Sequence, residues 1–131
     1  MNAVDEVVLH HRFIESWLRG EAEPSAVASF LGRHAPDFTW YDPDGAVKTL
    51  PDLAAMMEAA HGASPGLVLE IREPRVLLDE TRGGGMVVAA YEEHQRTPVS
   101  SDARRAVAVF APAPGARNGL LWRALHEVWI V

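Results

Sequence analysis

The last twelve residues, "LLWRALHEVWIV", place one imidazole in an otherwise apolar strand pattern. Side chains alternate between the two faces of a strand, so His126 is expected to share a face with Trp122 and Val128, beneath the helices. An imidazole there can transfer protons near neutral pH, or it can be a core side chain satisfied by one hydrogen bond. The chain has no cysteine, so its chemistry must use carboxylates, imidazoles or hydroxyls. His126 is therefore a candidate catalytic residue with a competing structural interpretation.

Asp42 is the second candidate, because it opens the turn "DPDG" after the apolar stretch "FTWY". A carboxylate held in a dry cavity becomes a stronger base, since burial raises its pKa. An Asp that opens a turn of this kind often accepts hydrogen bonds from its own backbone instead. The residues alone leave both interpretations open.

Several aromatic and thioether side chains could line a cavity for a flat apolar ligand, although each is also an ordinary core residue. On a helix, His10 and His11 lie about 100° apart, so at most one of them can point into such a cavity. We favour His10, which lies near Ile14 and Trp17 on the apolar stripe. The candidate ligand-binding residues are His10, Trp17, Trp40, Met57, Tyr91 and Trp122.

Other kinds of site have little support in the sequence. The six histidines show no metal-binding spacing, and the "GGG" run lacks the Lys-Ser or Lys-Thr of a phosphate loop, so we expect neither a metal nor a cofactor. A net charge of −6 with scattered basic residues argues against nucleic-acid binding. No membrane-length apolar run and no secretion signal are evident, so we expect a cytoplasmic protein with no membrane partner.

Three helices are predicted in the first half of the chain. Residues 4–18 carry apolar side chains at helical spacing, and Gly20 ends the pattern. A short helix is expected to start near Pro24, since proline is tolerated in a first turn. A third is expected in "TLPDLAAMMEAAHG", where Thr49 and Asp52 have the spacing of a capping box.

The second half of the sequence changes to β-rich runs separated by turn residues. These runs are "LVLEIREPRVLLD", "GMVVAAYEEHQRT", "RRAVAVFAPA" and "LLWRALHEVWIV", and a short hairpin is expected earlier, in "DFTWYDPDGAVKT". Helices followed by a meander predict one α+β domain over residues 1–131, with helices packed on one face of a mostly antiparallel sheet.

The opposite face of the last strand is amphipathic and is expected to carry Arg123, Glu127 and Trp129. An open sheet face with this composition would expose a large apolar patch unless another subunit covered it. We therefore expect a homodimer through the sheet face, with Arg123 and Glu127 pairing across the symmetric contact.

The segments "HRFIESWL", "FTWYDPDG", "VVAAYEEHQ", "RRAVAVF" and "GLLWRALHEVWI" together resemble the SnoaL-like and DUF4440 branch of the NTF2-like superfamily. The resemblance covers nearly the whole chain. It implies a cone-shaped α+β fold in which a curved sheet wraps the first helix, a cavity opens between sheet and helices, and dimers form through the sheet. The superfamily includes ketosteroid isomerase, limonene epoxide hydrolase, polyketide cyclases and ligand-binding proteins, so the fold does not settle the function.

Ketosteroid isomerase is the sharpest comparison, because the resemblance places its catalytic aspartate at Asp42. The tyrosine donor of that enzyme corresponds to Phe13, which has no hydrogen to donate, and "RRAVAVFAPA" offers no second donor. The isomerase machinery is therefore incomplete. The polyketide cyclases are a looser match, in which Asp42 and His126 would transfer protons during ring closure.

Two hypotheses of function follow. The first is a homodimeric NTF2-like domain whose apolar cavity binds a small organic molecule. The alternative is an acid and base enzyme of polyketide cyclase or isomerase type that acts on a carbonyl compound, with Asp42 as base and His126 as partner. A third possibility is a structural subunit whose cavity is filled by its own side chains.

Overall fold

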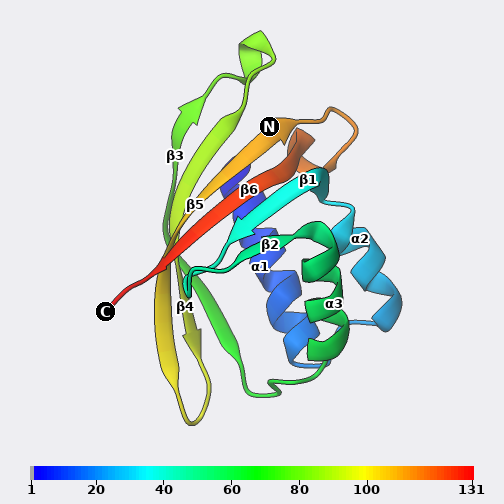
Figure 1. The fold of residues 1–131 in the computed structure, drawn as a ribbon, viewed down its shortest axis with the longest axis vertical. Coiled ribbons are helices and arrows are strands. Elements are labelled where there is room, and N and C mark those ends of the chain that lie inside the picture. Colours follow the sequence, from blue (N-terminus) through cyan, green and yellow to red (C-terminus); the bar gives the residue numbers. More distant parts are fainter. Residues whose placement is uncertain (1) are drawn as a thin grey trace.

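The computed structural model describes residues 2–131 and places the three α-helices on one face of a six-stranded sheet (Figure 1). The strands lie in the order β2-β1-β6-β5-β4-β3; β1 runs parallel to β6, and the other neighbours are antiparallel. The predicted α+β class and mostly antiparallel sheet are thus confirmed. The elements are α1 (Ala3–Leu18), η1 (Pro24–Ala26), α2 (Val27–Leu31), β1 (His34–Tyr41), β2 (Val47–Thr49), α3 (Leu50–Ala60), β3 (Val68–Asp79), η2 (Thr81–Gly83), β4 (Val87–Arg96), β5 (Ser101–Pro112), η3 (Arg117–Gly119) and β6 (Leu120–Trp129).

Helix α1 is fixed to the start of β6 by a buried carboxylate. Glu6 accepts hydrogen bonds from Arg117 Nε at 2.9 Å and Nη2 at 2.8 Å, and from Trp122 Nε1 at 3.1 Å. A buried charge of this kind is tolerated because it is paired and hydrogen-bonded. The apolar stripe of α1 then lies over the inner face of the sheet, with Val7 in the core.

Helix α3 begins where the capping pattern predicted. The Thr49 N–H donates to Asp52 Oδ2 at 2.9 Å, which satisfies a backbone donor at the start of the helix. At its far end the Trp17 indole donates to the Met57 carbonyl at 2.7 Å and ties α3 to α1. The buried face of α3 presents Leu53 and Met57 to the sheet.

Strand β6 departs from regular alternation at Arg123. Val109 of β5 pairs with Ala124, whereas the next residue, Phe110, pairs with Trp122, so Arg123 is one extra residue in β6. A bulge of this kind reverses which side chains face inward along the rest of the strand. After the bulge, therefore, the inward side chains are those at odd-numbered positions.

The bulge corrects three predictions. Trp129, expected on the outer face, pairs with Arg104 of β5 on the inner face, where the Arg104 guanidinium lies 4.7 Å from the centre of its ring. His126 is exposed on the outer face of the sheet and does not lie beneath the helices, and Glu127 is buried on the inner face instead of facing another subunit.

The predicted faces were right as far as Trp122 and wrong beyond it, because strict alternation was assumed through an inserted residue. Arg123 itself does lie outside, where it pairs with Asp37 at 3.3 Å.

Candidate functional site

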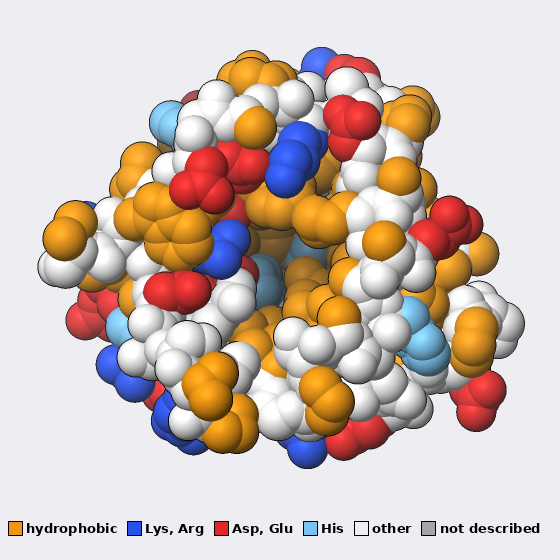
Figure 2. Space-filling view, turned by 60° about the horizontal axis from the view of Figure 1, so that its bottom comes forward, with side chains coloured by type: hydrophobic (Ala, Val, Ile, Leu, Met, Phe, Trp, Pro, Cys, Tyr) orange, Lys and Arg blue, Asp and Glu red, His pale blue; other side chains and the backbone are white. Residues whose placement is uncertain are grey.

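A cavity of about 260 Å³ lies between the three helices and the inner face of the sheet. Figure 2 looks into a hollow at the lower end of the molecule, with hydrophobic and histidine side chains deep inside it and charged side chains around its rim. Apolar side chains make up most of the cavity wall, among them Ile14, Phe30, Trp40, Leu53 and Met57. The polar side chains on the wall are His10, His34, Glu93, Gln95, Arg104 and Glu127.

The polar floor of the cavity comes from three neighbouring strands. Glu93 on β4 pairs with His11 of α1 at 2.8 Å and also accepts a hydrogen bond from the Gln95 amide. Arg104 on β5 lies between two carboxylates, 3.4 Å from Glu127 and 3.8 Å from Glu93. The longer distance suits an ion pair but not a hydrogen bond, and Arg104 Nε has no hydrogen-bond partner among residues 2–131.

His11 is charged, as its contacts indicate. Nδ1 faces the Val7 carbonyl at 2.8 Å and Nε2 faces the Glu93 carboxylate, so both ring nitrogens meet acceptors and both must carry hydrogen. Burial lowers the pKa of His11, but the Glu93 charge and hydrogen bond outweigh burial and raise it above 6.5. Burial likewise raises the pKa of Glu93, yet His11 and Arg104 bring it down to about 2. Glu93 is therefore a carboxylate at any ordinary pH.

Glu127 is the carboxyl group suited to proton transfer. Burial, then the nearby Glu93 charge, raise its pKa above 4.5 in spite of Arg104 and the Trp40 hydrogen bond. Glu127 Oε1 accepts from the Trp40 indole at 2.7 Å and from Arg104, and within residues 2–131 no hydrogen bond reaches Oε2. Two carboxyl groups with pKa values moved in opposite directions are a common arrangement in acid and base chemistry.

His10 and His34 form a second polar pair, and both rings are neutral. Burial lowers the pKa of His34 to about 4. Burial, and the repulsion that a protonated His34 would exert, lower the pKa of His10 well below 6.5. Their Nε2 atoms are 3.1 Å apart, so one of them donates and the other accepts. His34 Nδ1 lies 3.2 Å from the Leu31 carbonyl, which can only accept, so the proton of His34 is on Nδ1. The proton between the two rings therefore belongs to His10 Nε2.

Three of the six predicted ligand-binding residues line the cavity: His10, Trp40 and Met57. The other three are buried behind its wall. Trp17 packs between α1 and α3, Trp122 stacks on His10 with ring centroids 4.1 Å apart, and Tyr91 packs edge-on against His11 at 5.2 Å. Residue type alone could not separate a wall position from the layer of core behind it.

The two predicted catalytic residues lie outside the cavity wall. The Asp42 carboxylate accepts from the backbone N–H groups of Asp44 and Ala46, each at 2.9 Å, and pairs with Lys48 at 3.1 Å. Burial raises the pKa of Asp42, but these hydrogen bonds outweigh burial and leave the pKa below 3.8, which makes it a weak base. His126, on the outer face, packs edge-on against Tyr41 at 5.7 Å. The structure therefore does not bring Asp42 and His126 together in one chamber.

The sequence interpretation missed Glu93, Arg104 and Glu127 as residues of the cavity floor. Alternation along "YEEHQ" places Tyr91 and Glu93 on one face of the strand, but it does not tell whether that face is buried or meets water. A usable signal was present in the pairing: Arg104 is opposite Glu93 in β5, a cross-strand match of opposite charges. The inward orientation of Glu127 could be predicted only if the position of the bulge in β6 were known.

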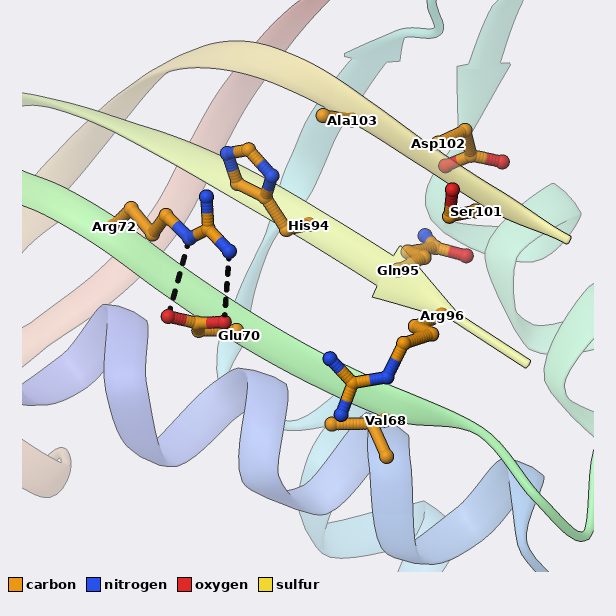
Figure 3. Close-up of a pocket in the computed structure, with 9 residues that line it drawn as sticks. All are labelled: Val68, Glu70, Arg72, His94, Gln95, Arg96, Ser101, Asp102 and Ala103. Carbon is orange, nitrogen blue, oxygen red and sulfur yellow. Dashed lines mark hydrogen bonds and ion pairs between the residues drawn. The ribbon is translucent and has the colours of Figure 1, made fainter. Parts of the chain in front are cut away.

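A second hollow, of about 330 Å³, crosses β3, β4 and β5 on the sheet face away from the helices (Figure 3). Its charged groups pair with one another: Arg72 with Glu70 at 3.1 Å along β3, and His94 with Glu92 at 2.9 Å along β4. This hollow is the larger of the two, but most of its polar side chains are exposed. We regard the cavity beneath the helices as the better candidate, because its polar groups are buried in an apolar wall.

Over residues 2–131, no three His, Asp or Glu side chains are grouped so as to hold a metal ion. No helix in the same range combines the length and apolar character that crossing a membrane requires.

Comparison with known protein structures identifies the fold family. No family model matches the chain. The crystal structure of an NTF-2-like protein of unknown function from Pseudomonas aeruginosa superposes with a TM-score of 0.87, at 27% identity over 97% of each chain. The protein belongs to the NTF2-like superfamily. The S. rosetta CaMKII hub also shares the fold, with a TM-score of 0.73 and 9% identity over 99% of this chain and 98% of the hub. The SnoaL-like or DUF4440 branch stays a prediction.

Curated relatives of this NTF2-like chain are longer proteins. Probable sucrose-phosphatase 2 of Arabidopsis thaliana is 28% identical over 134 residues, which cover 98% of this chain. Sucrose-phosphatase 2 of Nicotiana tabacum is 25% identical over 95% of it. The chain spans about 30% of the length of either relative.

Proposed function

We propose that this protein binds a small, mostly apolar organic molecule in the cavity beneath its helices. The observation that carries the proposal is a cavity of about 260 Å³ with an apolar wall and a buried polar floor. Ligand sites commonly combine such a wall with a few fixed polar groups that orient the ligand. The His11–Glu93 pair and the Trp40–Glu127 hydrogen bond hold those groups in place before any ligand arrives.

Filling the cavity tests this proposal. We expect 2-methoxynaphthalene to quench tryptophan fluorescence saturably in the wild type and not in Ala60→Phe, because Ala60 lines the cavity at the end of α3. Ala103→Phe is the matched control, since Ala103 lies on the outer face of β5 opposite His94. Equal binding to all three proteins would place the probe elsewhere and contradict the proposal.

A second candidate function is proton transfer on a carbonyl compound. It is supported by the raised pKa of Glu127 and by its Oε2 atom, which accepts no hydrogen bond from residues 2–131. In this form Glu127 takes the role that the sequence assigned to Asp42. We expect 2-tetralone in deuterium oxide to gain deuterium next to its carbonyl faster with protein than without, and Glu127→Gln to remove the difference. Asp42→Asn should keep it. If exchange were lost in Asp42→Asn and kept in Glu127→Gln, the base would be Asp42.

We also propose a homodimer through the outer face of the sheet. Tyr41, Val107 and Val128 are 45%, 39% and 48% exposed there, on three neighbouring strands. An exposed apolar patch on an open sheet is commonly covered by a second copy. Arg123 can still take part in that contact, whereas Glu127 cannot, because it is buried on the inner face.

Light scattering after size exclusion tests the assembly. We expect a dimer for the wild type and a monomer for Val128→Lys, because a buried unpaired ammonium is costly. Val99→Lys serves as the control, since Val99 lies in the turn between β4 and β5 and is 93% exposed. A monomeric wild type at micromolar concentration would rule the dimer out.

A further inference from the structure

A small pocket of about 120 Å³ lies between α1, α2 and η3, and it shares Phe30 with the wall of the cavity. Phe13 of α1 stacks on Phe30 with ring centroids 4.9 Å apart, so the apolar part of the pocket is firmly packed. The residues that α2 and its flanking turns contribute are three or four positions apart, which puts them on one side of a helix. The pocket is lined by Phe13, Ala26, Ser29, Phe30, Arg33 and Arg117.

Arg117 is fixed in this pocket by the buried Glu6 carboxylate. Its Nε and Nη2 donate to Glu6 at 2.9 Å and 2.8 Å, and Asn118 and Trp122 donate to the same carboxylate at 3.2 Å and 3.1 Å. A carboxylate has about four lone-pair positions, so Glu6 has none left for another cation. The Nη1 of Arg117 donates to no acceptor in residues 2–131 and is not a buried atom.

Arg33 has no counter-ion of its own among residues 2–131. Its guanidinium makes no ion pair and no hydrogen bond with them, and its nitrogens are not buried although the side chain is partly covered. Burial, then the Arg117 charge, lower the pKa of Arg33, while the Glu6 charge opposes the shift. Two cations and one anion leave a single positive charge uncompensated at this pocket. An anion placed between the two guanidiniums would balance it.

We propose that this pocket binds a small carboxylate with an apolar body. Both guanidinium groups would donate to the carboxylate, and the apolar part would lie against Phe13 and Phe30. A single negative charge matches the single uncompensated positive charge, whereas a phosphate dianion would exceed it. The planar fork of a guanidinium also fits a carboxylate in two parallel hydrogen bonds. The site is separate from the proposed ligand site in the cavity.

Benzoate and benzamide are matched probes for this pocket, because they have the same ring and nearly the same shape but only benzoate is charged at pH 7. We expect benzoate to bind the wild type about tenfold more tightly at low ionic strength, the lower end of the range for hydrogen bonds to a charged group. A titration followed by backbone amide signals in two-dimensional NMR spectra measures both affinities. The shifts should centre on residues 26–33.

Substitutions of Arg33 test the assignment. Arg33→Gln should remove the preference for benzoate, and Arg33→Lys should retain part of it, because lysine keeps the charge and loses the planar fork. Arg82→Gln is the matched control, since Arg82 is an exposed arginine on η2 and its loss changes the net charge by the same amount. Ala60→Phe fills the cavity and should leave benzoate binding within about twofold of the wild type. Thermal unfolding checks the fold of each variant.

Several outcomes would overturn the proposal. Benzoate might as a probe fail to bind, bind no better than benzamide, or keep its preference in Arg33→Gln, and each result would remove the site. A preference lost in Arg82→Gln would assign it to net charge, and one lost in Ala60→Phe would place benzoate in the cavity. Inorganic phosphate that moved the same signals at lower concentration would overturn the carboxylate class. Binding of 2-methoxynaphthalene tests the cavity separately, so failure of either proposal leaves the other in place.

Discussion

Two adjacent glutamates on β4 form nearly identical ion pairs on opposite faces of the sheet. Glu93 meets His11 at 2.8 Å on the inner face, and Glu92 meets His94 at 2.9 Å on the outer face. The inner side chains are 4% and 8% exposed, whereas the outer ones are 24% and 22% exposed. The two pairs therefore have matching contact distances but differ in their exposure to water.

That difference decides what each pair does. On the outer face, water and salt solvate both partners, so the attraction is weak and its loss is easily compensated. On the inner face neither charge has water to return to, and removing one partner leaves the other buried and unpaired. The inner pair is accordingly a fixed part of the cavity floor, and the outer pair is a surface feature.

The largest expected effect is that of Glu93→Gln. This change leaves the His11 imidazolium buried without its counter-ion, which typically costs about 3–5 kcal/mol of unfolding free energy. Urea unfolding followed by far-UV circular dichroism measures the loss. If stability fell by less than about 1 kcal/mol, the inner pair would behave like a surface pair and the contrast between the faces would collapse.

The pH dependence of the inner pair comes next in size. Glu93 has a lowered pKa, so its contribution is present above about pH 4.5 and is lost as the pH falls toward its folded value of about 2. A difference of that size corresponds to at most about 3 kcal/mol. His11 has a raised pKa, so its contribution is present below pH 6.5 and is lost as the pH rises through the folded value. The pair should therefore stabilise most between about pH 4.5 and 6.5.

Urea unfolding from pH 3 to pH 9 checks this profile. The double variant His11→Gln, Glu93→Gln removes both titrating groups and should flatten the curve on both sides. A wild-type optimum that persisted unchanged in the double variant would assign the pH dependence to other groups.

Glu127→Gln should have a smaller effect, and one of opposite sign. The pKa of Glu127 is raised in the folded protein, so the ionised form costs stability as the pH rises above about 4.5 through the folded value. The amide keeps an acceptor for Trp40 and removes the repulsion with Glu93. We expect the variant to match the wild type near pH 4.5 and to be the more stable of the two proteins at pH 8. Equal stability at both pH values would show that Glu127 titrates normally.

Much of the architecture could be predicted because its signals are local. The capping residues Thr49 and Asp52 lie where α3 begins, and Gly62 follows its end with a left-handed backbone, φ 73°. The helical stripe of α1 buries His10, which lines the cavity as expected. Such features depend on a few neighbouring residues, so a single sequence shows them.

The cavity floor could not be predicted to the same extent, because it depends on pairing between distant strands. Trp122 N–H donates to the Arg33 carbonyl at 2.9 Å where β1 departs from regular pairing with β6, and the extra residue Arg123 follows directly. Nothing in "LLWRALHEVW" marks that insertion. Because of this one-residue shift, Glu127 faces the cavity where His126 was predicted. The cavity therefore has a carboxyl group in place of the predicted imidazole.

The smallest expected effect belongs to Glu92→Gln, the counterpart of Glu93→Gln on the outer face. His94 loses its partner there but remains in contact with water, so the urea midpoint should stay within experimental error of the wild type at moderate salt. The outer face carries the proposed dimer contact, however, and burial by a second copy would change the result. A clear loss of stability that grows with protein concentration would mean that this pair is covered in the dimer. In that case both faces of β4 would hold buried pairs, and the contrast between them would arise from assembly as well as from the fold.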